Sequence, residues 1–245
     1  MQGASPDEAI VLVPGDDVAG MRGLDSVAHD AVLIGRGGAR FTATLGAPSV
    51  GGSAECRLYG LRDLRGEDGA KGWAVGFLNA LVSPTALDSI EVLSSRDSSA
   101  LAAEASRLAS TVTAASGASF QGLRFTAHDV RRFEAWPGVQ ALIAHLTRKV
   151  NQEANPQEEQ TLLIAERDSG VTTGAYTLAF AERTHGLEEQ IATSEVIAAA
   201  RLGGTSRTTL VVARDGENGV AYALLERVGV RRWRVRWTSR PTRCS

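Results

Sequence analysis

Two stretches of the chain are almost alike: Thr161-Leu162-Leu163-Ile164-Ala165-Glu166-Arg167-Asp168 and Thr209-Leu210-Val211-Val212-Ala213-Arg214-Asp215. Each is followed, after a turn that contains glycine, by a second apolar run that begins at a tyrosine, Tyr176 or Tyr222. Short aliphatic runs separated by turns are typical of strands in an antiparallel meander. The repeat therefore predicts an architecture for the C-terminal half, and it indicates no chemistry.

Shorter apolar runs predict further strands in the N-terminal half, at 9–13, 31–34, 41–45, 56–61 and 72–78. In the last of these, Trp73, Val75 and Phe77 alternate with smaller residues, which predicts a half-buried strand. Beyond the middle of the chain we expect strands at 120–133, 139–150 and 160–167. The segment 193–203 has features of both a helix and a strand, and we favour the strand.

A helical pattern is confined to about 83–115. Ser83-Pro84 has the form of an N-cap followed by proline in the first turn, and Ser94-Ser95-Arg96-Asp97 has the form of a break with a new cap. Beyond it, Leu101, Ala105 and Leu108 recur at the spacing of one helix face. The second part of this segment is the clearest helix in the sequence.

We therefore expect a β-dominated α+β protein with mostly antiparallel meander sheets, arranged as a sandwich or a barrel-like structure, and a helical segment at about 83–115. A length of 245 residues fits one large domain or two ordinary ones. A Gly/Ser-rich stretch at 117–122 divides a β-rich region, 1–117, that ends in the helical segment from a meander region, 118–245. We expect the two regions to pack as one unit.

Composition excludes several classes of protein. Apolar residues make up 43% of the chain, which is enough for a packed core, and the net charge of −2 gives no general attraction to nucleic acid. No apolar run reaches the roughly 18–20 residues of a membrane helix. The polar N-terminus does not resemble a signal peptide, so we expect either a cytoplasmic protein or one whose leader has been removed.

The only cysteines are Cys56 and Cys244. We predict a disulfide between them, which closes a long loop and is worth roughly 5 kcal/mol in the chain-entropy model. A disulfide favours an oxidising compartment, hence a periplasmic, secreted or lipid-anchored bacterial protein whose anchor is lost. The alternative is two free thiols in a cytoplasmic protein.

Glu166, Glu182 and Glu226 each precede an arginine near the end of a predicted strand. If these strands line a barrel, the carboxylates converge at one rim, where burial and mutual repulsion raise their pKa values for acid–base work. They are our candidates for catalytic residues. The alternative is that they leave the core and pair with arginines in solvent.

Arg232, Arg234 and Arg236 alternate with Trp233, Val235 and Trp237 near the C-terminus. Such a strand can present forked donors to anions, and these arginines are our candidate ligand-binding residues. Because the aromatic residues lie on the opposite face, binding of single-stranded nucleic acid is not expected. The alternative is an edge strand whose charges prevent aggregation. This tail, with its terminal cysteine, loosely resembles uncharacterised bacterial lipoproteins, and the resemblance implies no function.

Other catalytic patterns are missing from the sequence. The four histidines, His29, His128, His145 and His185, show no metal-binding spacing, and we expect neither a metal nor a cofactor. No nucleophile elbow, phosphate loop or dinucleotide fingerprint occurs. The acidic and amide-rich segment 151–159 is predicted to be a solvated hairpin tip.

The sequence favours a non-enzymatic extracytoplasmic binding or interaction module for an unknown small molecule or protein. One alternative is a hydrolase with a dispersed carboxylate site at Glu166, Glu182 and Glu226. Another is a protein that binds anions or polyanions through Arg232, Arg234 and Arg236. The three hypotheses differ in whether the glutamates share a pocket and in what surrounds the arginines.

Overall fold

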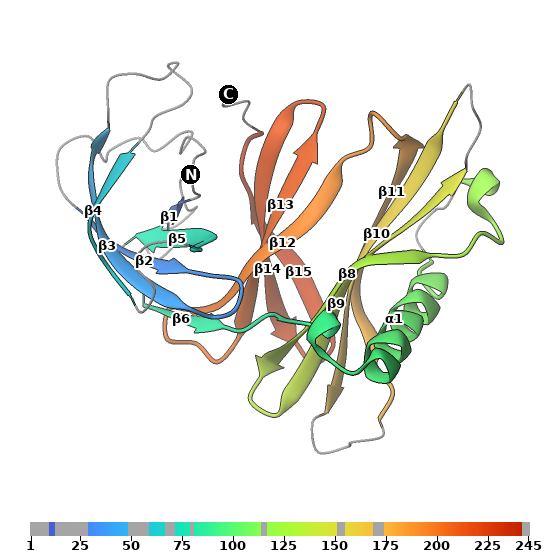
Figure 1. Cartoon of the computed structure of the whole chain (residues 1–245), viewed down its shortest axis with the longest axis horizontal. Helices are drawn as coiled ribbons and strands as arrows, with labels where there is room; N and C mark the ends of the chain where they lie inside the picture. Colours follow the sequence, from blue (N-terminus) through green and yellow to red (C-terminus); the bar gives the residue numbers. More distant parts are fainter. Residues whose placement is uncertain are drawn as a thin grey trace.

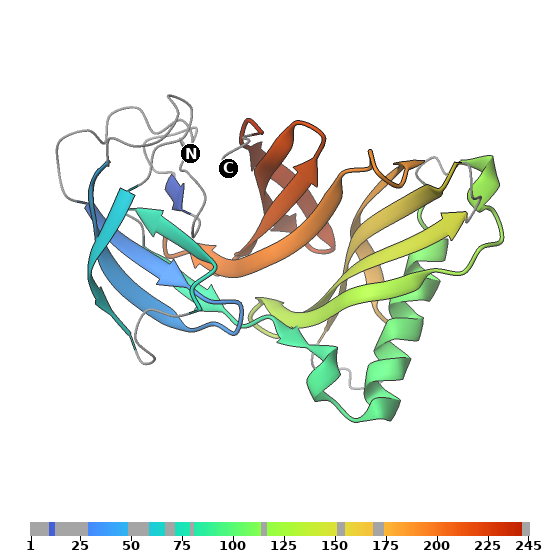
Figure 2. The same cartoon turned by 45° about the horizontal axis from the view of Figure 1, so that its top comes forward.

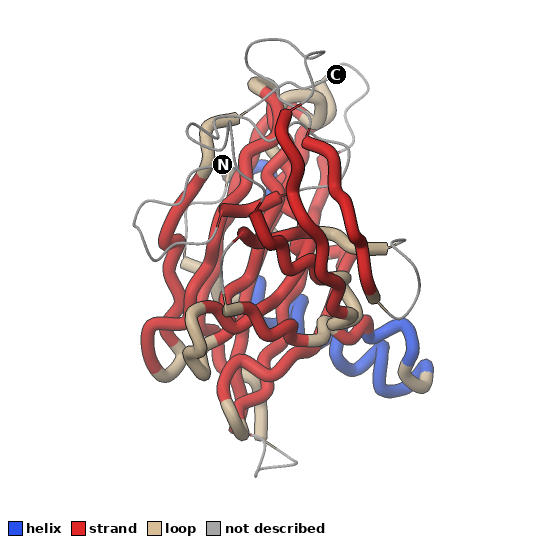
Figure 3. Tube along the Cα trace, turned by 90° about the vertical axis from the view of Figure 1, so that its left-hand side faces the viewer, coloured by secondary structure: helices blue, strands red, loops and turns tan. Residues whose placement is uncertain are grey.

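The computed structural model describes residues 10–12, 29–48, 59–66, 72–78, 81–113, 117–150, 155–168 and 174–241. The described strands form three antiparallel five-stranded sheets, and none of these sheets closes into a barrel (Figure 1). Strands dominate the trace in Figure 3. The predicted β-dominated α+β fold with antiparallel sheets is confirmed.

Each sheet has its own spatial order of strands. Sheet A contains, from edge to edge, β1 (Ile10–Leu12), β5 (Val75–Leu78), β2 (His29–Ile34), β3 (Arg40–Pro48) and β4 (Tyr59–Arg65). Sheet B contains β15 (Arg232–Thr238), β14 (Gly219–Gly229), β13 (Thr208–Gly216), β12 (Thr193–Leu202) and β6 (Val82–Thr85). Sheet C contains β11 (Thr177–Leu187), β10 (Gln157–Asp168), β9 (Val139–Val150), β8 (Thr126–Trp136) and β7 (Asp88–Ser89).

Sheet B lies between the other two sheets, as Figures 1 and 2 show. One of its faces packs on sheet A through a core that includes Val211 and Phe77. Its other face packs on sheet C through a core that includes Leu210 and Ile164. Helix α1 (Ser95–Ser110) covers the far face of sheet C. Because residues on both faces of sheets B and C are buried, the three sheets and helix α1 pack as successive layers.

Two sheets cross the predicted boundary near residue 117. Strand β6 pairs with β12 at the edge of sheet B, and β7 pairs with β8 at the edge of sheet C. Helix α1 also belongs to the first region and packs on strands of the second. The N-terminal region therefore supplies an edge strand or a cover to each sheet of the meander region.

Helix α1 begins where the second predicted cap lies. Ser94 is the N-cap and its hydroxyl accepts a hydrogen bond from Asp97 N at 3.2 Å. Ala105 and Leu108 are buried against sheet C, as the spacing predicts. The expected helical start at Ser83-Pro84 is wrong, because these residues lie in β6. Residues 88–92 form β7 and a short 3-10 helix, Ile90–Val92.

The meander predictions are largely confirmed. Strands β10 and β11 pair antiparallel, as do β13 and β14, and the ambiguous segment at 193–203 is strand β12. Strand β8 begins at Thr126 rather than at residue 120, because Ala118–Phe120 forms a 3-10 turn.

Strand β5 differs from the expected half-buried strand. All four of its residues are buried, with Val75 and Phe77 against sheet B and Leu78 in the core on the other side of sheet A. Cys56 and Cys244 both lie outside the described residues, so their predicted disulfide stays a prediction. Among the helices described, none has the length and apolar character that crossing a membrane requires.

Candidate functional site

The face of sheet C that looks toward sheet B changes from apolar to polar along its strands. Its apolar part, with Phe133, Ala141 and Ile164, belongs to the core between the sheets. Farther along the same strands the registered neighbours are Asp129, His145, Leu162 and Glu182, one from each of β8, β9, β10 and β11. Three of these four residues are polar, so polar side chains begin where the core between the sheets ends.

A partly open cavity of about 180 Å³ lies where the apolar part of this face meets its polar part. Sheet C contributes Asp129, Ile143, His145 and Leu162, and the start of β12 contributes the run Thr193–Val196. Ile143, Leu162 and Val196 also belong to or adjoin the core between the sheets, so they form an apolar floor. The polar members provide carboxylate, imidazole and hydroxyl groups above it.

His145 is held in one orientation by Gln160. The Gln160 side-chain nitrogen donates to Glu158 Oε1 at 3.1 Å, which leaves Gln160 Oε1 facing His145 Nε2 at 3.2 Å. Since an amide oxygen only accepts, Nε2 carries the hydrogen and Nδ1 of the neutral ring is an acceptor. Burial lowers the pKa of His145, and the nearby His128 lowers it further, against the opposing effect of Gln160. The ring is therefore neutral at pH 7.

His128 lies beside His145 with its ring centroid 5.9 Å away. Its Nε2 shares a hydrogen bond of 2.5 Å with the hydroxyl of Thr147, which is on the same strand as His145. The two histidines thus come from adjacent strands and are each fixed by a different polar neighbour. Proteins often place such groups beside ligand cavities.

The two carboxylates of the cavity are each paired on one oxygen. Arg131 Nε donates to Asp129 Oδ2 at 2.9 Å, and Arg36, from the loop after β2, donates to Glu195 Oε1. A carboxylate has about four acceptor positions, so each retains capacity for another donor. The cavity wall consequently offers more acceptors than donors.

Glu166, a predicted catalytic candidate, lies instead in the core between sheets B and C. Its carboxylate accepts from Arg227 Nε at 2.8 Å, Arg227 Nη2 at 2.9 Å, Arg231 N at 3.0 Å and Trp233 Nε1 at 2.7 Å. Burial alone raises the pKa of Glu166, but these four donors outweigh it and lower the pKa overall. A carboxylate held ionised in this way serves as a structural anion and is a poor general acid.

Glu182 and Glu226 have separate partners. Glu182 accepts from Arg214 of β13 at 2.5 and 2.7 Å. Glu226 neighbours Arg227 in β14, so its side chain leaves the opposite face of sheet B and lies near Arg236, at 3.5 Å. Each of the three glutamates therefore belongs to its own ion pair, and the structure does not bring them together at a rim.

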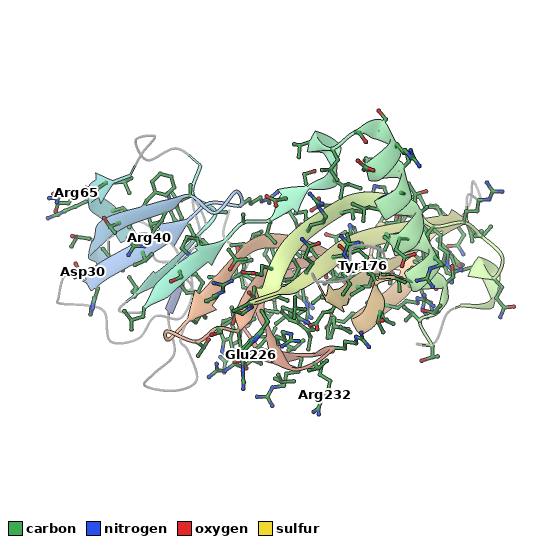
Figure 4. All side chains as sticks on the ribbon, turned by 90° about the horizontal axis from the view of Figure 1, so that it is seen from below. Asp30, Arg40, Arg65, Tyr176, Glu226 and Arg232 are labelled. Atoms are coloured by element: carbon green, nitrogen blue, oxygen red, sulfur yellow. The ribbon has the colours of Figure 1, made fainter. Side chains whose placement is uncertain are left out.

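The alternation predicted for the arginine strand is present in β15. Arg232, Arg234 and Arg236 are exposed, and Trp233 is buried in the core between the sheets. Arg234 and Arg236 lie 3.9 and 3.5 Å from Glu226, which partly balances their charge. Figure 4 shows Glu226 and Arg232 on the same lower edge of the molecule.

The expected solvated tip at 151–159 is wrong at its C-terminal end, because β10 begins at Gln157. Glu158 and Glu159 are buried, and Glu159 lies 2.7 Å from Arg148 and 3.3 Å from Arg183. Arg183 also donates to Ala109 O at 2.7 Å, near the C-terminal end of α1. Through Arg183, Glu159 helps to hold the helix on sheet C.

No described group of three or more His, Cys, Asp or Glu residues is placed to hold a metal ion. The sequence reasoning missed the cavity, because its residues come from strands that adjoin only in the folded sheets. Polar His145 and Thr147, on the same face of β9 as Ala141 and Ile143, were the available signal. No family model matches the chain, and no match to it was found among the curated proteins or the solved structures.

Proposed function

We propose that the protein is a binding module that takes a small amphipathic molecule in the cavity between β8–β10 and the start of β12. The observation that carries this proposal is the joining of an apolar floor to a wall of convergent polar groups. Ligand sites commonly combine these two features. The volume of about 180 Å³ is close to that of an engineered cavity of roughly 150 Å³ that binds benzene.

The wall favours a ligand that donates hydrogen bonds. Asp129 and Glu195 accept only, and neutral His145 offers Nδ1 as an acceptor. The hydroxyl groups of Thr193 and Ser194 can accept as well as donate. We therefore propose a primary amine or an alcohol with a short hydrocarbon tail, whose tail covers Ile143 and Leu162.

Calorimetric titration with two probes of equal chain length tests this proposal. Hexylamine presents an ammonium head and hexanoate presents a carboxylate head, so their tails are matched and their charges are opposite. We expect saturable binding of hexylamine and much weaker binding of hexanoate, because the carboxylate of hexanoate would lie beside the carboxylates of Asp129 and Glu195.

The matched variants are Ser194→Phe, which fills the cavity from β12, and Ser206→Phe, which places the same ring in an exposed turn. Ser194→Phe should abolish hexylamine binding and Ser206→Phe should preserve it. Equal binding of both probes, or binding that survives Ser194→Phe, would contradict the proposed ligand and place.

A second proposal is anion or polyanion binding through β15. The exposure of Arg232, Arg234 and Arg236 on an edge strand supports it, while Glu226 weakens it by balancing part of their charge. Retention on heparin that falls steeply with added salt is the expected result. Retention that is absent, or that the triple change of these arginines to Gln leaves unaltered, would remove this proposal. The separate ion pairs of Glu166, Glu182 and Glu226 give the hydrolase alternative no support.

An extracytoplasmic location is also part of our proposal, and it rests on the predicted Cys56–Cys244 disulfide. Intact mass measured under denaturing conditions without reductant tests it. A mass two hydrogens below the reduced value supports the bond and an oxidising compartment. The full reduced mass would withdraw both.

A further inference from the structure

Tyr176 lies immediately before β11 and is 4% exposed, packed between sheet C and helix α1. Figure 4 shows it among side chains beneath α1, well apart from Arg232. Its phenol oxygen is buried, and no described donor or acceptor reaches it. A buried hydroxyl without a partner is costly, so such an atom calls for an explanation.

Two arginines accompany this phenol. The Arg167 guanidinium stacks on the Tyr176 ring, 4.6 Å from its centroid, and donates to Gln140 Oε1 at 3.0 Å. Arg132 is partly buried, and its Nε, like the phenol oxygen, is enclosed and without a partner among the described residues. Both positive charges lie near enough to Tyr176 to oppose the rise in its pKa that burial causes.

Of the described carboxylates near this cluster, Asp88 of β7 lies opposite Arg132 in register without forming an ion pair with it, and two others have arginine partners of their own. Glu104 of α1 accepts from Arg107 at 2.7 and 2.8 Å, and Glu134 of β8 accepts from Arg201 at 2.5 Å. In the described part of the chain, neither Arg132 nor Arg167 forms an ion pair with a carboxylate. Two half-buried guanidinium groups that form no ion pair with the described residues are unfavourable, and a bound anion would stabilise them.

The backbone places the arginines at a suitable separation. Arg132 on β8 is opposite Leu142 of β9, which is opposite Ala165 of β10, and Arg167 follows two residues later on the same face. With neighbouring strands roughly 4.8 Å apart and a rise of about 3.3 Å per residue, the two arginine backbones are about 12 Å apart. Long side chains from both strands can therefore meet above buried Leu142.

We propose that Arg132, Arg167 and the hydroxyl of Tyr176 form a binding site for a small oxyanion of phosphate size, between sheet C and α1. Arginine forks suit the geometry of phosphate and carboxylate oxygens. The phenol stays protonated at pH 7 and donates a third hydrogen bond. This site lies on the face of sheet C opposite the cavity of His145, and it is independent of the function proposed for that cavity.

Isothermal titration calorimetry with inorganic phosphate, at pH 7 and at an ionic strength held constant with chloride, tests the site. The wild-type protein should show one saturable binding event. Arg132→Gln should raise the dissociation constant at least about tenfold, since a charge-assisted hydrogen bond is lost. Tyr176→Phe keeps the ring beneath Arg167 and removes only the hydroxyl, so it should weaken binding by roughly three- to tenfold.

Arg207→Gln is the matched control, because it removes the same charge from an exposed bend between β12 and β13 that belongs to neither proposed anion site. It should change the dissociation constant less than about twofold. Three results would overturn the proposal: no saturable binding to the wild type, equal binding in Tyr176→Phe, or a loss in Arg207→Gln as large as in Arg132→Gln. If Arg132→Gln fails to fold, Tyr176→Phe alone decides. Repeating the titration with acetate separates a site for oxyanions in general from one that requires phosphate.

Discussion

Glu166 and Arg227 form a bidentate ion pair between two sheets, with Arg227 Nε and Nη2 donating to the two carboxylate oxygens at 2.8 and 2.9 Å. Glu166 belongs to β10 of sheet C and Arg227 to β14 of sheet B, so the pair joins the two layers across their core. Trp233 and the backbone of Arg231 satisfy the remaining acceptor positions of the carboxylate. A buried charge pair is tolerated only when its hydrogen bonds are satisfied in this way.

Replacing Glu166 with Gln should lower the free energy of unfolding by about 3–5 kcal/mol, because Arg227 would keep a buried charge without its partner. Urea denaturation followed by tryptophan fluorescence measures the change. Glu226→Gln is the control, since Glu226 faces exposed arginines at 3.5 and 3.9 Å and should cost less than about 1 kcal/mol. Equal losses of unfolding free energy in the two variants would show that the buried ion pair stabilises the protein no more than the exposed one.

Acid should destabilise the protein partly through Glu166. The pKa of Glu166 is lowered in the folded state, below its ordinary value of 4.5. The stability it contributes is therefore complete above that value and is lost as the pH falls through the folded pKa. Urea midpoints measured between pH 6 and 3 should fall more steeply for the wild type than for Glu166→Gln. Parallel slopes would contradict this role.

A second pH effect should arise from His145. Burial lowers its pKa below the ordinary value of 6.5, with His128 adding to the effect and Gln160, Glu158 and Asp129 opposing it. The unfolded chain then takes up a proton before the folded protein does, so stability is complete above about pH 6.5 and falls as the pH drops toward 5. His145→Gln should flatten the dependence of the melting temperature on pH in this window. Substituting exposed His185 in the same way should change it less.

Helix α1 should depend on its N-cap. Ser94 accepts a hydrogen bond from Asp97 N and donates one to Asp97 Oδ2 at 2.8 Å. Ser94→Ala should therefore cost about 1 kcal/mol of stability in thermal or urea unfolding. Ser99→Ala, at an exposed position inside the helix, should be neutral or slightly stabilising. A loss in Ser99→Ala equal to that in Ser94→Ala would argue against the cap.

Much of the secondary structure could be predicted because it follows from local periodicity. The paired runs that begin at Thr161 and Thr209 are strands β10 and β13, and the alternation of arginine with tryptophan in β15 matches its exposed and buried faces. The cap at Ser94 could be predicted for the same reason, because the side chain of an N-cap residue bonds to backbone N–H groups two or three residues farther along the chain. In each of these cases the determining contacts lie close together in the chain.

The candidate sites depend on contacts between distant segments. Ser83-Pro84 has the form of a helix start, yet pairing with β12 draws it into sheet B as β6. Glu166 precedes an arginine in sequence, yet its partner is Arg227, which the packing of sheet B on sheet C brings to it. The sequence by itself determined which segments are strands and which residues share a face, because alternation is a local property. Only the tertiary structure decided which faces meet, and so placed His145 beside β12 and Arg132 near Tyr176. The burial that drives the packing of the sheets is not directional, so the sequence of a strand does not identify the sheet on which its apolar face packs.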